Sequence, residues 1–482
     1  MKKQKSITFN FVMNVILSMS SFIFPLITFP YVSRVLLPDG TGKVSFATSV
    51  ITYFAMFAQL GIPTYGIRAC AKVRDDRKKL SKTVQELFCI NLLMTVVAYI
   101  AFGIALLTVP RLQQDKTLFV IISLTMIFNA IGMEWLYKAL EQYTYITVRS
   151  IVFKFVALIA MFVFVRQKAD YVVYGAITIL ASSASNIFNF INIHKYVDME
   201  VSEKLQIKKH LKPVLVFFAM SCATTIYTHL DTVMLGFMKT DTDVGYYNAA
   251  VKIKTILVTV VTSLGTVLLP RVSYYIEKGM MEEFWKTARK AMNFVVMFSV
   301  PLFIFFILFA REGVYFLSGN AFEGAVIPMQ IIMPTLLFIG MTNIMGIQML
   351  VPMGKEKFVL YSEIAGAIVD LVLNMILIPR YAAAGAAIGT MAAEIVVWIV
   401  QLYFMRENVR ILYTGKSYLT VVILAILGAI CVFPVKKTEF SPMLTLVLSA
   451  VIYFGIYAVG LLITKEPLFM EMLQKFVKKH GK

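Results

Sequence analysis

Long apolar segments alternate with short polar connections along the whole chain. Most of these segments have the roughly 20 residues that a helix needs to cross about 30 Å of hydrocarbon. They form a first six, a second six and a last pair: 7–33, 44–67, 87–110, 117–137, 150–165 and 171–193; 213–238, 244–270, 291–310, 324–352, 358–379 and 382–405; 417–435 and 442–464. The pattern predicts an all-α polytopic membrane protein with 14 transmembrane helices.

Composition supports this prediction. Of the 482 residues, 59% are hydrophobic and 15% are charged, whereas soluble domains average about 25% charged residues. The net charge of +19 could suggest nucleic acid, but basic loops of membrane proteins report orientation and lipid contact, so we expect no nucleic-acid partner. The sequence shows no nucleotide-binding loop, catalytic grouping or metal-ligand spacing, so we expect no enzyme activity, no cofactor and no metal site.

The basic residues predict the orientation of the chain. With the N-terminus placed in the cytoplasm, the inner connections hold roughly three times as many Lys and Arg residues as the outer ones. The bias persists through all the alternations and predicts that both termini are cytoplasmic. The long polar connections are all on the inner side, and the outer ones are short.

The two sets of six segments correspond to each other. Gly42 aligns with Gly245, and Arg68 aligns with Arg271 at the end of the following segment. Six helices per half in the same orientation make a parallel repeat, and transporters built this way bind substrate between the halves. We therefore expect a six-helix bundle at 1–200, a second at 201–410, and two further helices with a basic cytoplasmic tail at 411–482.

The connection between the seventh and eighth segments is flanked by intramembrane charges. Asp231 precedes it and Lys252 follows it at a similar depth of about 10–12 Å, and Lys254 adds a second cation. Charges inside a bilayer normally face a partner or a wet cavity. The surplus of cations favours an anion-accepting transport cavity in which Asp231 pairs with one lysine; the alternative is a structural ion pair between helices.

The first helix contains Pro25 and Pro30, directly followed by Arg34. Each proline removes a backbone hydrogen bond and bends the helix, which could form the hinge of alternating access or a static kink. Arg34 could contact an anionic head group or extend to the outer surface. In the fifth helix, Arg149 and Lys154 could receive an anionic substrate from the cytoplasmic side or contact lipid phosphate.

Other polar residues have simpler interpretations. Glu134, Lys138 and Glu141 have the spacing of local helical ion pairs. The small-residue run at 382–389 predicts close helix packing. Asp370 and Glu394 lie within the eleventh and twelfth segments, where they could couple transport to a proton or cation, or could make polar contacts between helices.

Several stretches together resemble one transporter family, over most of the chain. They are Phe29-Pro30-Tyr31-Val32-Ser33-Arg34-Val35-Leu36 with Gly42 and Phe46-Ala47, Gly61-Ile62-Pro63-Thr64-Tyr65-Gly66-Ile67-Arg68, Leu230-Asp231-Thr232-Val233-Met234-Leu235-Gly236, and Ile378-Pro379-Arg380-Tyr381-Ala382-Ala383-Ala384-Gly385-Ala386-Ala387. The chain resembles bacterial polysaccharide flippases of the Wzx type, in the multidrug, oligosaccharidyl-lipid and polysaccharide exporter superfamily.

The resemblance implies a multi-pass protein of the bacterial plasma (inner) membrane. Its expected substrate is an undecaprenyl-diphosphate-linked oligosaccharide, which crosses from the inner to the outer leaflet by alternating access for capsule or O-antigen synthesis. Substrate contacts are then expected at Arg34, Lys154, Lys252 and Lys254, with Asp231 holding a lysine. Expected partners are membrane lipids and other polysaccharide-assembly membrane proteins.

Two other functions compete with this interpretation. A drug or cation antiporter of the same superfamily would need more intramembrane acids and fewer cations. A membrane polysaccharide polymerase would resemble its relatives in having a sizeable outer loop, and all outer connections here are short.

Overall fold

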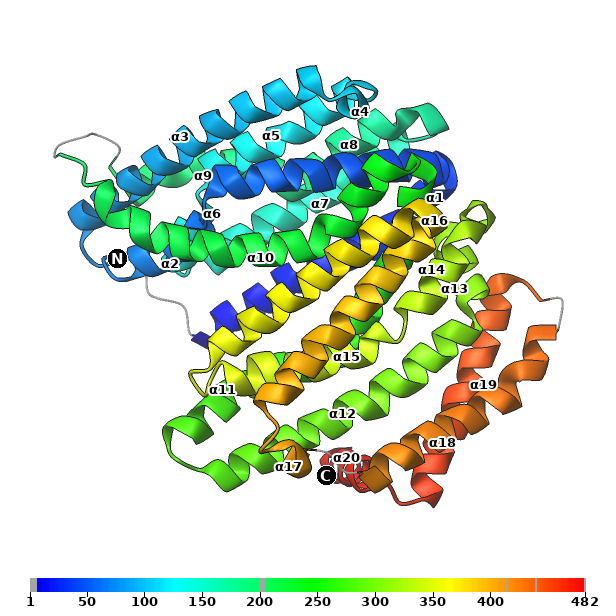
Figure 1. Ribbon diagram of the computed structural model, residues 1–482. Helices are drawn as coiled ribbons and strands as arrows, with labels where there is room; N and C mark the ends of the chain where they lie inside the picture. The colour runs from blue at the N-terminus through cyan, green and yellow to red at the C-terminus, as the bar shows by residue number, and fades with distance from the viewer. Residues whose placement is uncertain (1–6, 199–203, 413–414, 438–439, 481–482) are drawn as a thin grey trace. The chain divides into compact units, whose positions relative to one another are not determined.

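The computed structural model describes residues 7–198, 204–412, 415–437 and 440–480, which form helices and turns with no strand (Figure 1). Ten helical stretches in these residues are long and apolar enough to cross a membrane, and an eleventh is added if the bent pair Asn320–Ile332 and Thr335–Leu350 counts as one span. The chain divides into two compact units, Met1–Gly245 and Tyr246–Lys482. The three-part division predicted from the repeat remains a prediction.

The first unit contains ten α-helices. They are α1 (Ile7–Gln59), α2 (Ile62–Ala71), α3 (Arg77–Thr108), α4 (Pro110–Gln113), α5 (Lys116–Gly132), α6 (Glu134–Ala139), α7 (Tyr143–Phe164), α8 (Tyr171–Ile179), α9 (Asn186–Asn192) and α10 (Lys208–Met238), with short helices η1 (Lys168–Asp170), η2 (Leu180–Ala184) and η3 (Ile193–Lys195). Helix α1 packs against α3, α5, α7 and α10. Although α10 is the first helix of the second repeat by sequence, its contacts place it in this unit.

The second unit begins within α11 (Asp241–Glu277). It continues with α12 (Met281–Leu308), α13 (Ala310–Ser318), η4 (Asn320–Ala325), α14 (Val326–Ile332), α15 (Thr335–Thr342), η5 (Asn343–Leu350), α16 (Glu356–Phe404), α17 (Val409–Leu412), α18 (Gly415–Val432), η6 (Phe433–Lys437), α19 (Pro442–Ile463) and α20 (Pro467–His480). Helices α18 and α19 lie side by side, as the orange and red ribbons in Figure 1 show. Helix α12 packs against both α15 and α18.

Local sequence explains where the helices begin and turn. The Asp76 side chain accepts from the backbone N–H groups of Lys78 and Lys79, which caps α3. Helix α1 breaks at Leu37, whose φ of 60° and ψ of 178° belong to a region that is essentially reserved for glycine. Helix α16 breaks in the same way at Ala382, with φ 48°.

The predicted close packing at 382–389 is confirmed. A Cβ atom on Gly385 would lie 2.4 Å from the Leu377 carbonyl oxygen, so the two arms of α16 fold back on each other at glycine distance.

Large apolar side chains cover the outside of both units. Leu93, Leu107, Val451 and Ile463 are 64–75% exposed on helices that qualify as membrane spans. Soluble proteins rarely expose continuous apolar surface of this kind. These faces suit a hydrocarbon solvent, in agreement with the predicted membrane location.

Candidate functional site

Lys154 lies in the middle of α7 and reaches α1. Its Nζ donates to Ser20 Oγ at 2.8 Å and to Ser21 Oγ at 2.9 Å. Both acceptors are neutral hydroxyl groups, so these contacts orient the ammonium group without neutralising its charge. Among the predicted substrate contacts, Lys154 thus contacts polar side chains of another helix.

A second group of charges lies at the start of the same helix. Arg149 is buried, and its Nη2 is 3.4 Å from Glu134 Oε2. Glu134 Oε1 also binds Lys138 Nζ at 2.8 Å, which confirms the predicted pair at i,i+4 spacing. The predicted Lys138–Glu141 pair is replaced by a 2.7 Å bond between Glu141 and Arg74, because α6 ends at Ala139 and Glu141 takes a left-handed φ of 57°.

Arg34 is exposed at the end of the proline-containing segment of α1. Its Nη1 donates to the Pro30 carbonyl oxygen at 2.5 Å, within its own helix. The backbone at Pro25 and Pro30 stays helical, and the sharp departure lies further on, at Leu37 before Pro38. A hinge at the two prolines and an anion contact at Arg34 stay predictions.

The charges around the α10–α11 connection are divided between the two units. Asp231 is buried on α10 in the first unit, whereas Lys252 is exposed and Lys254 half-buried on α11 in the second. Their pairing remains a prediction. On α10, His229 Nδ1 lies 3.2 Å from Ser49 Oγ on α1.

The turn between α10 and α11 is locked against the break in α1, a feature that sequence reasoning did not identify. Arg111 of α4 binds the Asp241 carboxylate and donates from Nε to the Gly236 carbonyl oxygen at 2.8 Å. A Cβ on Gly42 would lie 1.8 Å from the Asp241 carbonyl oxygen, and one on Gly245 would lie 2.1 Å from that of Pro38. Only glycine permits this approach, so the two glycines that the repeat aligns form one backbone seam.

Asp370 and Glu394 are both buried on α16, one on each arm. A Cβ on Gly389 would lie 2.9 Å from Asp370 Oδ1 and 2.3 Å from Asn374 Oδ1, so the glycine leaves the space that these oxygens occupy. The arrangement places two acids in an apolar hairpin, and their predicted part in ion coupling stays a prediction.

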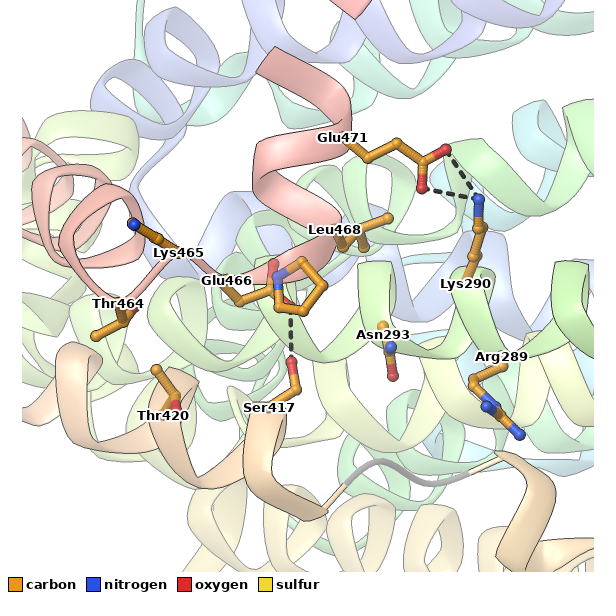
Figure 2. A pocket seen from close by; sticks show the side chains of 11 residues that line it. Arg289, Lys290, Asn293, Ser417, Thr420, Thr464, Lys465, Glu466, Leu468 and Glu471 are labelled. Atoms are coloured by element: carbon orange, nitrogen blue, oxygen red, sulfur yellow. Dashed lines mark hydrogen bonds and ion pairs between the residues drawn. The ribbon is translucent and has the colours of Figure 1, made fainter. Parts of the chain in front are cut away.

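A pocket of about 560 Å³ opens in the second unit, between α12, α18 and the start of α20 (Figure 2). Lys290 Nζ pairs with Glu471 at 2.7 Å, and the buried Glu466 accepts from Ser417 Oγ and from Phe469 N, each at 2.7 Å. These bonds attach α20 to α12 and α18. Glu466, Glu471 and Lys290 are already paired. We therefore interpret the pocket as the place where α20 is anchored rather than as a diphosphate site.

Comparison with known proteins agrees with the geometry. The model of the polysaccharide biosynthesis protein family matches residues 7–276, and that of the MatE family matches residues 217–376. Proteins described as O-antigen transporters are similar: that of Escherichia coli strain K12 is 25% identical over 81% of this chain and 94% of its own length, and that of Shigella dysenteriae is 23% identical over 81% and 97%.

A solved structure has the same fold. The lipid II flippase MurJ in its inward closed conformation superposes with a TM-score of 0.72 at 14% identity, covering 93% of this chain and 99% of that one. The fold, the apolar surface and the relatives place the protein in the bacterial inner membrane, with multiple passes. The chain belongs to the polysaccharide biosynthesis protein family, as the resemblance to Wzx-type flippases led us to expect.

Proposed function

We propose that the protein moves an undecaprenyl-diphosphate-linked oligosaccharide from the inner to the outer leaflet by alternating access, for capsule or O-antigen synthesis. The observation that carries the proposal is the family match over residues 7–276, together with relatives described as O-antigen transporters. A diphosphate with its sugars cannot cross hydrocarbon unaided, because stripping water from such groups is prohibitive. A polar path inside the helices removes this barrier.

Intramembrane cations suit such a substrate. We assign substrate contacts to Arg34, Lys154, Lys252 and Lys254, with Asp231 holding one of the lysines. Support comes from the contacts of Lys154 with neutral groups and from the charge surplus on α11, where two lysines follow within about three turns of Val244. The lipid tail stays in the membrane while the diphosphate travels inside.

We also propose 14 transmembrane helices with both termini in the cytoplasm. Two of the candidate spans contain a break, at Leu37 and at Ala382, so each can cross twice. The bent pair and the shorter helix Lys116–Gly132 supply the remaining crossings. The Lys and Arg bias of the connections supports the orientation.

Alternating access requires a contact that closes one end and can open. The seam formed by Gly42, Gly245, Arg111 and Asp241 has this character, since it is held by one ion pair and a backbone contact. Bending at Pro25 and Pro30 would move the part of α1 that precedes these prolines relative to the seam.

The proposal is tested with purified protein in vesicles that contain a fluorescent undecaprenyl-diphosphate oligosaccharide. Transfer between leaflets should require the protein and should fall in Lys252→Ala/Lys254→Ala but not in the exposed control Lys278→Ala. Transfer equal to that of protein-free vesicles would refute the proposal.

The MatE match raises a second function, antiport of a drug or cation. In the flippase, Asp370 or Glu394 would couple transport to a proton or sodium gradient. Ionophores should then reduce transfer, and Asp370→Asn or Glu394→Gln should remove that sensitivity; transfer indifferent to ionophores would exclude coupling through these acids.

A further inference from the structure

Arg149 is a buried cation with unused hydrogen-bonding capacity. Its side chain lies in α7 and the residue is 8% exposed. Among the residues that the structure describes, Nε and Nη1 have no hydrogen-bond partner, and Nη2 has one long contact of 3.4 Å to Glu134 Oε2. A guanidinium presents five N–H donors, and a buried donor left without an acceptor is costly. Such a group is poised to donate hydrogen bonds to the oxygen atoms of a ligand.

The surroundings of Arg149 carry a surplus of positive charge. Glu134 is shared by Arg149 and Lys138, and Lys154, one and a half turns further along α7, binds the hydroxyl groups of Ser20 and Ser21. Two cations thus share one carboxylate, and a third cation follows on the apolar helix α7 with no carboxylate partner among the residues that the structure describes. A shared carboxylate neutralises one of them, so the cluster can take an additional anion.

The geometry of α7 arranges the cations by depth. Arg149 is about 9 Å and Lys154 about 16 Å from the start of the helix at Tyr143, at roughly 1.5 Å per residue. An anion that reaches Arg149 therefore has a second cation deeper in the same unit. Tyr145, at the start of α7, stacks on Tyr137 with ring centroids 5.3 Å apart.

We infer that Arg149 is the phosphate-binding residue of the first unit. Once Glu134 leaves Nη2, two phosphate or diphosphate oxygens accept side by side from Nε and Nη2, the fork that arginine offers to oxyanions, and Nη1 remains for a further oxygen, while Lys138 and Lys154 add positive charge. Glu134 is the internal counter-ion that the phosphate displaces. This inference rests on the proposed function. It adds the residue that first binds the phosphate, Arg149, and the carboxylate that competes with the phosphate for it, Glu134.

Two sources could provide the phosphate: the diphosphate of the polyprenyl carrier or the head group of an anionic phospholipid. Protein in phosphatidylcholine nanodiscs is titrated with undecaprenyl diphosphate in one arm and phosphatidylglycerol in the other, with binding followed by native mass spectrometry. The control is Arg166→Gln, an exposed arginine just beyond the other end of α7.

Arg149→Gln should weaken undecaprenyl diphosphate binding about tenfold or more, because charge-assisted bonds are lost. Arg149→Lys should lose less, since lysine keeps the charge without the fork. Glu134→Gln should strengthen binding severalfold by removing the competing carboxylate. A purely structural Glu134–Arg149 pair predicts the reverse for Glu134→Gln, so this variant separates the two roles even if Arg149→Gln does not fold.

Unchanged binding in Arg149→Gln and Arg149→Lys, or weaker binding in Glu134→Gln, would overturn the inference. If the Arg149 variants lose binding of undecaprenyl diphosphate and of phosphatidylglycerol equally, this would support a site that both phosphates share. If the wild type binds phosphatidylglycerol through Arg149 but does not bind undecaprenyl diphosphate, the phosphate site stands and the proposed substrate fails.

Discussion

Two buried charges in the first unit, Glu86 and Arg149, have opposite surroundings. Glu86 is fully buried and accepts from Lys209 Nζ at 2.8 Å, His210 Nε2 at 2.8 Å and Gln206 N at 2.7 Å. Among the residues that the structure describes, the one polar contact of Arg149 is that with Glu134 at 3.4 Å. A charge whose hydrogen bonds are all made serves structure, whereas a buried charge with unused donors is available to a ligand.

The Glu86 network holds residues 206–210 to α3. Because the carboxylate can only accept, His210 donates from Nε2 and takes the Tyr65 hydroxyl on Nδ1 at 2.8 Å. Nearer the start of α3, Arg77 binds Asp198 at 2.7 Å and Ser81 Oγ accepts from the Asp198 N–H group. Asp198 and residues 206–210 are therefore held to α3.

The largest effect is expected for Glu86→Gln. Removing one partner of a buried charge network typically costs about 3–5 kcal/mol, because the remaining charge is left without compensation. The unfolding midpoint in detergent, followed by intrinsic fluorescence, should fall clearly. Glu141→Gln, which breaks the more exposed pair with Arg74, should change it little; equal shifts would break the comparison.

Arg149→Gln should separate function from stability. Removing a poorly paired buried cation should leave the unfolding midpoint near or above that of the wild type. Export of surface polysaccharide by cells should nevertheless fall about tenfold or more. A large drop in the midpoint would instead assign Arg149 a structural role like that of Glu86.

Arg111→Gln tests an intermediate case. Arg111 is paired with Asp241 but remains partly accessible, and its guanidinium lies 4.8 Å from the centre of the Phe46 ring. We expect a loss of about 1 kcal/mol and faster hydrogen–deuterium exchange in residues 236–245. Exchange equal to that of the Arg166→Gln control would show that this pair does not hold the seam closed.

The smallest effect belongs to Asp198, which is exposed. The hydrogen bond from Arg77 lowers the pKa of Asp198 below its ordinary value of 3.8. The stabilisation that the Arg77–Asp198 pair provides is therefore present above the ordinary pKa of Asp198. It is lost as pH falls through the lower pKa of the folded state. Hydrogen–deuterium exchange at residues 193–198 of the wild type should rise only at acid pH. Asp198→Asn should show the higher exchange rate at neutral pH. Identical pH profiles for the two proteins would show that Asp198 does not hold these residues to α3.

Periodicity and spacing predict much of the fold but little of the contrast between Glu86 and Arg149. The membrane helices, the packing at Gly385 and the Glu134–Lys138 pair follow from local patterns. Glu86 stood at the edge of a polar connection, and its partners lie about 120 residues later, so no local pattern reveals its burial. The sequence identifies Arg149 as a cation, but its unpaired donors depend on where Glu134 points at the start of α6, after the left-handed backbone of Met133.

The most direct test of the central claim is leaflet transfer of a labelled undecaprenyl-diphosphate oligosaccharide in vesicles that contain the wild type, Arg149→Gln or Arg166→Gln. The account predicts rapid transfer with the wild type and Arg166→Gln, and transfer reduced about tenfold or more with Arg149→Gln. Transfer by Arg149→Gln at the wild-type rate would contradict the phosphate site, and no transfer by the wild type above empty vesicles would contradict the proposed function itself.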